Sequence, residues 1–297
     1  MSASSRNRCS EATEVAPRIA GSHASEPTES AQSFLRWAGG KRWLLPHLPK
    51  ILGDFKITRY YEPFFGGGAV FFGSSVIESA HLSDLNAELI ETYVQVRDNC
   101  SLVADYLALH VSTSEHYYAV RSSMPDAPAE RAARFIYLNQ TSYNGIYRVN
   151  LKGQYNVPFG GRTNIPSREV IATASRKLQG ANLTVSDFET AVKGAGEGDL
   201  VFLDPPYTVA HNNNGFIKYN QQLFSFQDQA RLSKAIDGLR ERGVYYLLTN
   251  AAHASITALF DKGDQKLELS RGNSVGGKHA QRGSATEYVF TNLPAHG

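Results

Sequence analysis

The 297-residue sequence lacks several features that mark common protein classes. Its two cysteines, Cys9 and Cys100, are too few for a disulfide framework and do not have the spacing of zinc ligands. Its nine histidines form neither an HxE nor an HExxH pattern, which argues against zinc deaminases and zinc proteases. No apolar run approaches the roughly 20 residues of a membrane span. We therefore expect a protein without a bound metal and without a membrane segment, located in the cytoplasm.

The first 30 residues lack the apolar periodicity of a folded segment. They are rich in Ser, Ala, Glu and Thr and contain no apolar region typical of a signal peptide. Their four glutamates argue against a transit peptide. The composition predicts a disordered tail over residues 1–30.

Positive charge is concentrated in one part of the chain, although the formal net charge is only +2. Between residues 131 and 182, eight lysines and arginines accompany a single acid, Glu169. Tyrosines and phenylalanines alternate with these basic residues. A charge run is most often a solvated face, but basic residues interleaved with aromatic ones favour nucleic-acid binding.

Strand-like and helix-like patterns alternate along most of the chain, which predicts an α/β fold. Strands are expected in residues 57–64, 80–86, 181–188, 199–207 and 244–250, and an antiparallel closing pair in 265–270 and 285–292. Helices are expected after the glycines of 66–79 and over 87–98 and 227–243. Between residues 99 and 180 short helices replace this pattern, followed by a hairpin in 146–159 whose three-residue loop ends at Gly153. The expected organisation is a catalytic domain of residues 31–98 and 181–297, with a recognition insert of residues 99–180.

Three glycines, Gly66 to Gly68, lie between an expected strand and an expected helix. Glycine there allows a ligand to approach the backbone closely. Asp84 follows the first glycine by 18 residues, near the position where an acid meets ribose hydroxyls in dinucleotide-binding folds. An N-cap of the following helix is the alternative role for Asp84. The "GGK" at residues 39–41 lacks the GxxxxGK[ST] frame of a phosphate-binding loop.

The tetrapeptide Asp204-Pro205-Pro206-Tyr207 ends an apolar strand, because proline cannot continue the hydrogen-bond ladder. It therefore lies at the carboxyl end of a strand, where open α/β sheets bind ligands. The Asp204 carboxylate and the Pro205 carbonyl can accept hydrogen bonds from an exocyclic amine and so localise its lone pair. Tyr207 can stack on the base. A stiff turn without function is the alternative, but the upstream glycines and Asp84 favour N-methylation from a sulfonium.

The chain resembles the Dam-type, D12-class DNA adenine-N6 methyltransferases over nearly all residues after 33. The matching segments are "FLRWAGGKRWLLP", "EPFFGGGAVFF", "SDLN", "FIYLNQTSYNGIYRVNLKGQYNVPFG", "SDF" and "LDPPY", in that family's order. The resemblance implies a Rossmann-like domain dependent on S-adenosylmethionine, with a mainly helical target-recognition insert that carries a β-hairpin.

The resemblance also implies roles for individual residues around the cofactor and the target base. The residues implied to bind S-adenosylmethionine are Trp37, Lys41, Glu62, Phe64, Gly66, Gly68, Asp84, Asp187, Phe188 and Asp204. Among them, Asp187 and Phe188 of "SDF" are implied to hold the adenine of the cofactor. Asp204, Pro205, Pro206 and Tyr207 are implied to act on a flipped-out adenine. Phe216, Tyr219 and Phe224 are expected to wall the pocket, although aromatic residues at this spacing are more often core.

A second set of residues is implied to contact double-stranded DNA. These residues are Arg36, Tyr143, Asn144, Arg148, Pro158 and Arg162. For Arg36 a guanine contact, a phosphate contact and plain solvent exposure all stay open. The stretch "SRGNSVGGKHAQRG" departs from the family's more basic pattern, so the resemblance does not extend to Arg271, Lys278 and Arg282.

The sequence thus predicts a site-specific enzyme that transfers a methyl group from S-adenosylmethionine to N6 of adenine in double-stranded DNA, in the sequence GATC. One alternative is an N-methyltransferase acting on RNA or on a protein amide, although protein-amide enzymes resemble Asn-Pro-Pro-Tyr and residue 204 is Asp. Another is an inactive DNA-binding relative. A cognate restriction endonuclease acting separately on the same site is left open as a partner.

Overall fold

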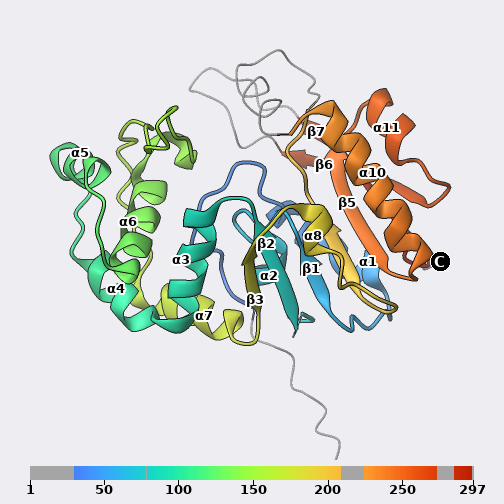
Figure 1. Ribbon diagram of the computed structural model, residues 1–297, viewed down its shortest axis with the longest axis horizontal. Helices are drawn as coiled ribbons and strands as arrows, with labels where there is room; N and C mark the ends of the chain where they lie inside the picture. The colour runs from blue at the N-terminus through green and yellow to red at the C-terminus, as the bar shows by residue number, and fades with distance from the viewer. Residues whose placement is uncertain (1–29, 78, 209–223, 273–283, 296–297) are drawn as a thin grey trace, which may run out of the picture.

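The computed structural model describes residues 30–77, 79–208, 224–272 and 284–295. These residues form a seven-stranded sheet flanked by helices (Figure 1). The strand order is β3-β2-β1-β4-β5-β7-β6. The strands are β1 (Tyr60–Glu62), β2 (Ala80–Asp84), β3 (Asn182–Val185), β4 (Leu200–Leu203), β5 (Tyr245–Ala251), β6 (Gln265–Gly272) and β7 (Ser284–Thr291). Strands β1 to β5 are parallel, and β7 is antiparallel to both β5 and β6.

The order of the strands reverses next to β1. The chain passes from β1 to β2 and β3 on one side, then returns to place β4 and β5 on the other. In register, Tyr60 of β1 pairs with Ala80 of β2 and with Leu200 of β4. The carboxyl ends of β1 and β4 are therefore neighbours at a topological switch point, where open α/β sheets bind ligands.

The sheet is covered on both faces, as its apolar strands require. In β4, Leu200 and Phe202 belong to one hydrophobic core, whereas Val201 and Leu203 belong to the core on the opposite face. The flanking helices are η1 (Arg42–His47), α1 (Leu48–Leu52), α2 (Ala69–Gly73), α3 (Ala87–Asp98), α8 (Phe188–Ala191), α10 (Phe226–Glu241) and α11 (Ala254–Phe260). The expected α/β fold class is confirmed.

Residues 99–180, the expected recognition insert, are mainly helical and extend to one side of the sheet (Figure 1). It contains α4 (Cys100–Ala108), α5 (Ser114–Ser122), α6 (Pro128–Thr141), η2 (Tyr143–Gly145) and α7 (Arg168–Leu178). Helix α6 packs on α3 and α4. Val103 and Ile136 belong to the same buried core as Leu200 of the central sheet. The insert therefore shares a core with the sheet, and its boundaries at residues 99 and 180 stay a prediction.

The expected hairpin is present in the insert, held by single bridges instead of continuous strands. Val149 pairs with Tyr155 in antiparallel fashion. The Asn150 side-chain oxygen accepts the backbone N–H groups of Lys152 at 2.9 Å and Gln154 at 3.0 Å. Gly153 has a φ of +74°, which suits the last position of a three-residue loop.

Several elements are shorter than the sequence predicts. Strand β1 covers residues 60–62 of the expected 57–64, and α2 covers 69–73 of the expected 66–79. Pro63 follows β1 directly and supplies no N–H to a ladder. No helix in the described residues is long and apolar enough to cross a membrane. Residues 1–29, Phe216, Tyr219, Lys278 and Arg282 lie outside the described residues, as do the expectations placed on them.

Candidate active site

The segment before η1 packs directly on the glycine turn that follows β1. A Cβ atom on Gly66, whose φ is +46°, would lie only 2.6 Å from Cδ1 of Trp37. The Trp37 indole also stacks on Tyr147, with ring centroids 5.9 Å apart and an interplanar angle of 21°. Trp37 thus joins the glycine turn to the recognition insert, and a side chain at residue 66 would push it away.

Three polar side chains fix the glycine turn. The Tyr93 hydroxyl donates to the Gly66 carbonyl at 2.8 Å, and Ser33 Oγ donates to the Gly67 carbonyl at 2.5 Å. Asp84 Oδ2 accepts the N–H of Gly66 at 3.0 Å, and its Oδ1 accepts the N–H of Asn86 at 2.9 Å. Burial raises the pKa of Asp84, and these backbone donors oppose the rise.

The N-cap of α3 is Asn86, not Asp84. Asn86 Oδ1 accepts the N–H of Leu89 at 3.1 Å. The capping alternative for Asp84 is therefore wrong, because Asp84 lies two residues too early and binds the glycine turn instead. Its predicted contact with the cofactor ribose stays a prediction.

The Asp204 carboxylate at the end of β4 is held through one oxygen. Its Oδ1 accepts hydrogen bonds from Lys41 Nζ at 2.8 Å and from Thr249 Oγ1 at 2.8 Å. Within the described residues, Oδ2 accepts no hydrogen bond. Burial raises the pKa of Asp204, while the Lys41 ammonium opposes that rise and favours the carboxylate. One oxygen is thus anchored and the other is left for a substrate donor.

Tyr207 is anchored by a residue that sequence reasoning missed. Its hydroxyl donates to Glu287 Oε2 at 2.5 Å, and Lys41 Nζ lies 3.8 Å from that same oxygen. Lys41 Nζ also lies 4.8 Å from the centroid of the Tyr207 ring. Burial, reinforced by the nearby carboxylates of Asp204 and Glu287, raises the pKa of Tyr207 well above its usual value, so the phenol stays protonated.

Glu287 lies in β7, which pairs with β5 so that Glu287 faces Ala251 across the ladder. The Glu287 side chain is 3% exposed. The one signal in the sequence is that an acid, Glu287, lies within the alternating strand "ATEYVFTN". An acid buried in a strand is almost always paired, so its presence could have pointed to a partner nearby. Only the antiparallel return of β7 brings this acid to the end of β4.

The predicted cofactor residue Glu62 is buried within the protein. Its Oε2 accepts the Tyr60 hydroxyl at 2.8 Å, and the Phe71 N–H is a further donor. Burial raises its pKa well above the usual value for glutamate. Whether Glu62 meets the cofactor stays a prediction.

Asp187 and Phe188 lie at the start of α8, beyond the end of β3. Asp187 is the N-cap of this helix, and its Oδ1 accepts the N–H of Glu189 at 3.0 Å. The ring of Phe188 stacks on Phe64 with centroids 5.5 Å apart. Phe224 packs on both rings and is 6% exposed, so in this structure it belongs to the core. These contacts bring together three expected site residues from distant segments.

Arg36 is folded back onto the insert. Its NH1 donates to the carbonyls of Gln140 and Ser142, each at 3.3 Å, at the end of α6. Burial and the nearby Arg162 lower its pKa. The Arg36 side chain is therefore not simply exposed to solvent. To contact DNA, its NH1 would have to give up these two hydrogen bonds.

The other predicted DNA-contacting residues lie together on and beside the hairpin. They are exposed: Tyr143, Asn144, Arg148, Pro158 and Arg162. Asn144 has a left-handed φ of +56°, so it also has a backbone role in this turn. Arg148 Nε donates to Asn156 Oδ1 at 2.8 Å, which holds the guanidinium against the opposite side of the hairpin.

The structure thus brings three separate segments together in one cluster: Lys41, the Asp204–Tyr207 tetrapeptide and Glu287. Within the described part of the chain, no group of three or more His, Cys, Asp or Glu side chains is arranged to hold a metal ion. A carboxylate with one open oxygen next to an aromatic ring is suited to binding an amine on a planar ring.

Comparisons with known proteins agree with this geometry. The pattern of the D12 class N6 adenine-specific DNA methyltransferases matches residues 37–271. The Type II methyltransferase M1.LlaDCHI of Lactococcus lactis subsp. cremoris is 38% identical over 87% of this chain and 94% of its own length. The Type II methyltransferase M.MjaIII of Methanocaldococcus jannaschii is 34% identical over 73% and 83%. The DNA adenine methylase of Escherichia coli K12 is 33% identical over 74% and 80%. The resemblance expected from the sequence is confirmed: the chain belongs to the D12 class of N6 adenine-specific DNA methyltransferases and is an enzyme of that kind.

Proposed function

We propose that the enzyme transfers the methyl group of S-adenosylmethionine to N6 of an adenine flipped out of double-stranded DNA, within the sequence GATC. The observation that carries the proposal is the state of Asp204. Lys41 and Thr249 bind its Oδ1, and Oδ2 accepts no hydrogen bond from the described residues. A carboxylate in this state can accept a hydrogen bond from the amine of the target base.

The residues at the carboxyl edge of the parallel strands fit S-adenosylmethionine. Asp84 is the last residue of β2 and binds the glycine turn after β1, and Asp187 comes two residues after the end of β3. Between them lies Ser186, whose N–H donates to the Asp84 carbonyl at 3.2 Å. Its Oγ is buried without a hydrogen-bond partner in the described residues. Acids and an unsatisfied hydroxyl are suitable partners for ribose hydroxyls and an adenine amine.

The bound cofactor would supply a methyl group on a sulfonium, which is an electrophile. The remaining chemistry belongs to this chain. Asp204 Oδ2 and the Pro205 carbonyl accept the two hydrogens of the adenine amine, so that its lone pair turns away from the ring. Transfer of that methyl group to N6 would leave the amine with one proton too many, and the Asp204 carboxylate is placed to accept that proton. Tyr207 holds the base by stacking, which contributes about 1–3 kcal/mol.

The proposed target sequence comes from the hairpin. Its likeness to the GATC-reading hairpin of the family rests on Tyr143, Asn144, Arg148 and Pro158. A two-stranded ribbon fits the major groove, and a guanidinium can bind guanine through two hydrogen bonds. We assign base reading to Arg148 and a contact with a neighbouring base to Tyr143.

We assign DNA recognition to residues 99–180. The same proposal includes a cytoplasmic location and a restriction endonuclease that acts separately on the same site. The nuclease is supported by similarity to proteins named Type II methyltransferases.

The test is methylation of a plasmid of known sequence, followed by single-molecule sequencing for N6-methyladenine. We expect modification in GATC, no transfer to RNA or protein, and a loss of about 10²–10³ in single-turnover rate for Asp204→Ala with cofactor binding largely retained. A different modified motif would overturn the sequence assignment alone. Transfer by Asp204→Ala within tenfold of the wild-type rate would overturn the role of Asp204.

A further inference from the structure

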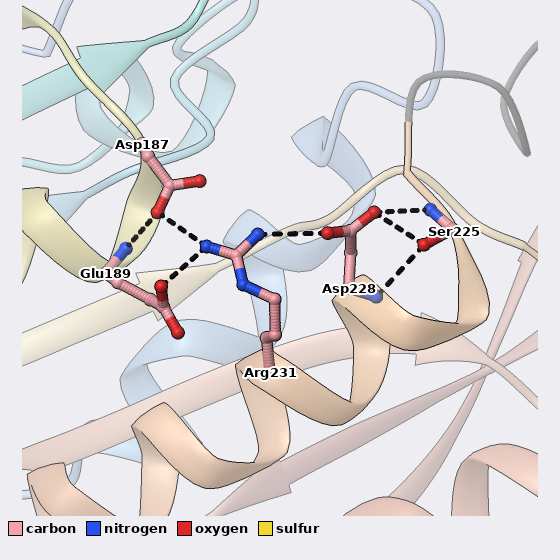
Figure 2. A network of polar contacts seen from close by, with 5 residues as sticks. All are labelled: Asp187, Glu189, Ser225, Asp228 and Arg231. Atoms are coloured by element: carbon pink, nitrogen blue, oxygen red, sulfur yellow. Dashed lines mark hydrogen bonds and ion pairs between the residues drawn. The ribbon is translucent and has the colours of Figure 1, made fainter.

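One arginine outside the predicted site joins three carboxylates near the cofactor residues (Figure 2). Arg231, on α10, contacts Asp187 Oδ1 at 3.2 Å and Glu189 Oε2 at 2.5 Å through the same nitrogen. Its NH1 contacts Asp228 Oδ1 at 3.0 Å. Asp228 in turn closes the capping box of α10 with Ser225. The arginine thus connects the first turn of α10 to the start of α8.

The arginine also contacts the aromatic neighbour of Asp187. Its guanidinium carbon lies 5.0 Å from the centroid of the Phe188 ring. Phe64 stacks on that ring as well, with centroids 5.5 Å apart. Arg231 therefore restrains both residues that the family resemblance assigns to the adenine of the cofactor, while it is placed in the sequence more than 40 residues from either.

The contacts with Asp187 leave one of its oxygens open. Arg231 and the Glu189 N–H both bind Oδ1, and within the described residues Oδ2 accepts no hydrogen bond. In Figure 2 the second carboxylate oxygen of Asp187 lies away from the arginine. The guanidinium can bind Asp187, Glu189 and Asp228 at the same time, because its donors have a rigid, divergent arrangement that the single nitrogen of an ammonium lacks.

We propose that Arg231 is a positioning residue for the adenine end of S-adenosylmethionine. It orients Asp187 so that Oδ2 can accept a hydrogen bond from the adenine amine, and it keeps the Phe188 ring in place beside the base. This inference rests on the proposed function for the identity of the cofactor. It adds a residue that touches neither the cofactor nor DNA and acts through Asp187.

The test measures binding of S-adenosylmethionine and of 5′-methylthioadenosine by calorimetry. The second ligand carries the adenine end without the amino acid. Arg231→Ala should weaken both ligands by a similar factor of about five to ten, because exposed ion pairs in a network each contribute modestly. Arg231→Lys, which keeps the charge without the planar donors, should show a smaller loss. The methylation rate at saturating cofactor should stay near that of the wild type.

Glu189→Gln is the matched control, since it removes one partner of Arg231 and leaves the contact with Asp187. It should bind both ligands within about twofold of the wild type. A double-mutant cycle then separates positioning from a general loosening of the fold. In an Asp187→Asn background, Arg231→Ala should weaken binding little further.

Two results would overturn the inference: wild-type affinity in both Arg231 variants, or full additivity in the Asp187→Asn background. Failure of the proposed function would look different. In that case the wild-type enzyme itself would bind neither S-adenosylmethionine nor 5′-methylthioadenosine. Thermal unfolding of each variant checks that the fold is retained, and Arg231→Lys keeps the test decisive if Arg231→Ala does not fold.

Discussion

Replacing Lys41 by methionine should raise the pKa of Asp204 further, so that its carboxylate takes up a proton at a higher pH than in the wild type. Lys41 is 3% exposed, and its Nζ lies 2.8 Å from Asp204 Oδ1. Burial already raises the pKa of Asp204, and Glu287 adds to the rise, whereas Lys41 opposes it. Methionine has a similar length without the charge, so the opposing contribution disappears while the burial stays.

The size of the effect follows from the contact. An opposite charge within about 4–6 Å lowers a carboxyl pKa by about 1–3 units. Each unit corresponds to about 1.4 kcal/mol. In the proposed mechanism Asp204 accepts the amine hydrogens only as a carboxylate, so the methylation rate should rise with pH through its pKa. The acid limb of the rate profile should therefore move to higher pH in Lys41→Met.

Single-turnover methylation of a duplex oligonucleotide, measured from pH 5 to 9 at saturating cofactor, checks this. Thr249→Val is the matched control, because its hydroxyl donates to the same oxygen at the same 2.8 Å without carrying a charge. A neutral hydrogen bond is worth about 0.5–1.5 kcal/mol, so the shift should be about one unit or less. Lys50→Met, an exposed lysine in α1, should leave the profile unchanged.

The reasoning would be refuted by a loss of rate in Lys41→Met that is the same at every pH. That outcome would mean that Lys41 acts through cofactor binding or folding and does not keep Asp204 ionised. Direct titration of the variant with S-adenosylmethionine separates a loss of cofactor binding from a loss of folding.

Three further predictions concern the residues around this cluster. The pKa of Glu62 is raised in the folded state, so the stability of the wild type should fall as pH rises above the unfolded pKa of about 4.3. Glu62→Gln should therefore gain stability relative to the wild type between pH 4.5 and 8, as measured by urea unfolding, and a difference that is constant with pH would contradict this. Asn144 has a φ of +56°, so Asn144→Val should lose about 1–2 kcal/mol of unfolding free energy, whereas Asn144→Gly should lose little, and equal losses would argue against the backbone role. Asn156→Ala removes the acceptor of Arg148 Nε, so it should lose part of the preference for GATC that Arg148→Ala is expected to lose. The measurement is the relative methylation of GATC and of sites altered at one position, and an unchanged preference would show that Arg148 does not need Asn156.

Much of the fold could be predicted because its signals are local. Helix α3 covers residues 87–98, as its apolar spacing indicated, and Asn86 begins it with a side-chain cap. Strand β4 ends at Leu203, directly before Asp204 and the two prolines. The three-residue loop of the hairpin followed from Gly153. In each case residues within a few positions determine the result.

The part of the site that was missed depends on contacts between distant segments. Glu287 accepts the Tyr207 hydroxyl although the two residues are 80 positions apart in the sequence. Arg36 was assigned to DNA contact by its position in the sequence. Its guanidinium instead donates hydrogen bonds to two backbone carbonyls at the end of α6, more than 100 residues away. Such contacts depend on strand order and helix packing, which spacing along the chain does not specify.

The acids of the site fall into two kinds, and the difference indicates what each can do. Asp84 has both oxygens bound by backbone N–H groups, so it holds the glycine turn and has only its remaining lone pairs for a ligand. Asp204 and Asp187 each have one oxygen anchored by a cation and a second donor, and the other oxygen is open. A buried carboxylate without a cation would take up a proton and lose its value as an acceptor. One with both oxygens occupied would stay charged but could not accept from a base. Anchoring through a single oxygen holds the acid in place and leaves its other oxygen available, and it occurs here at the two places where an adenine amine is proposed to bind.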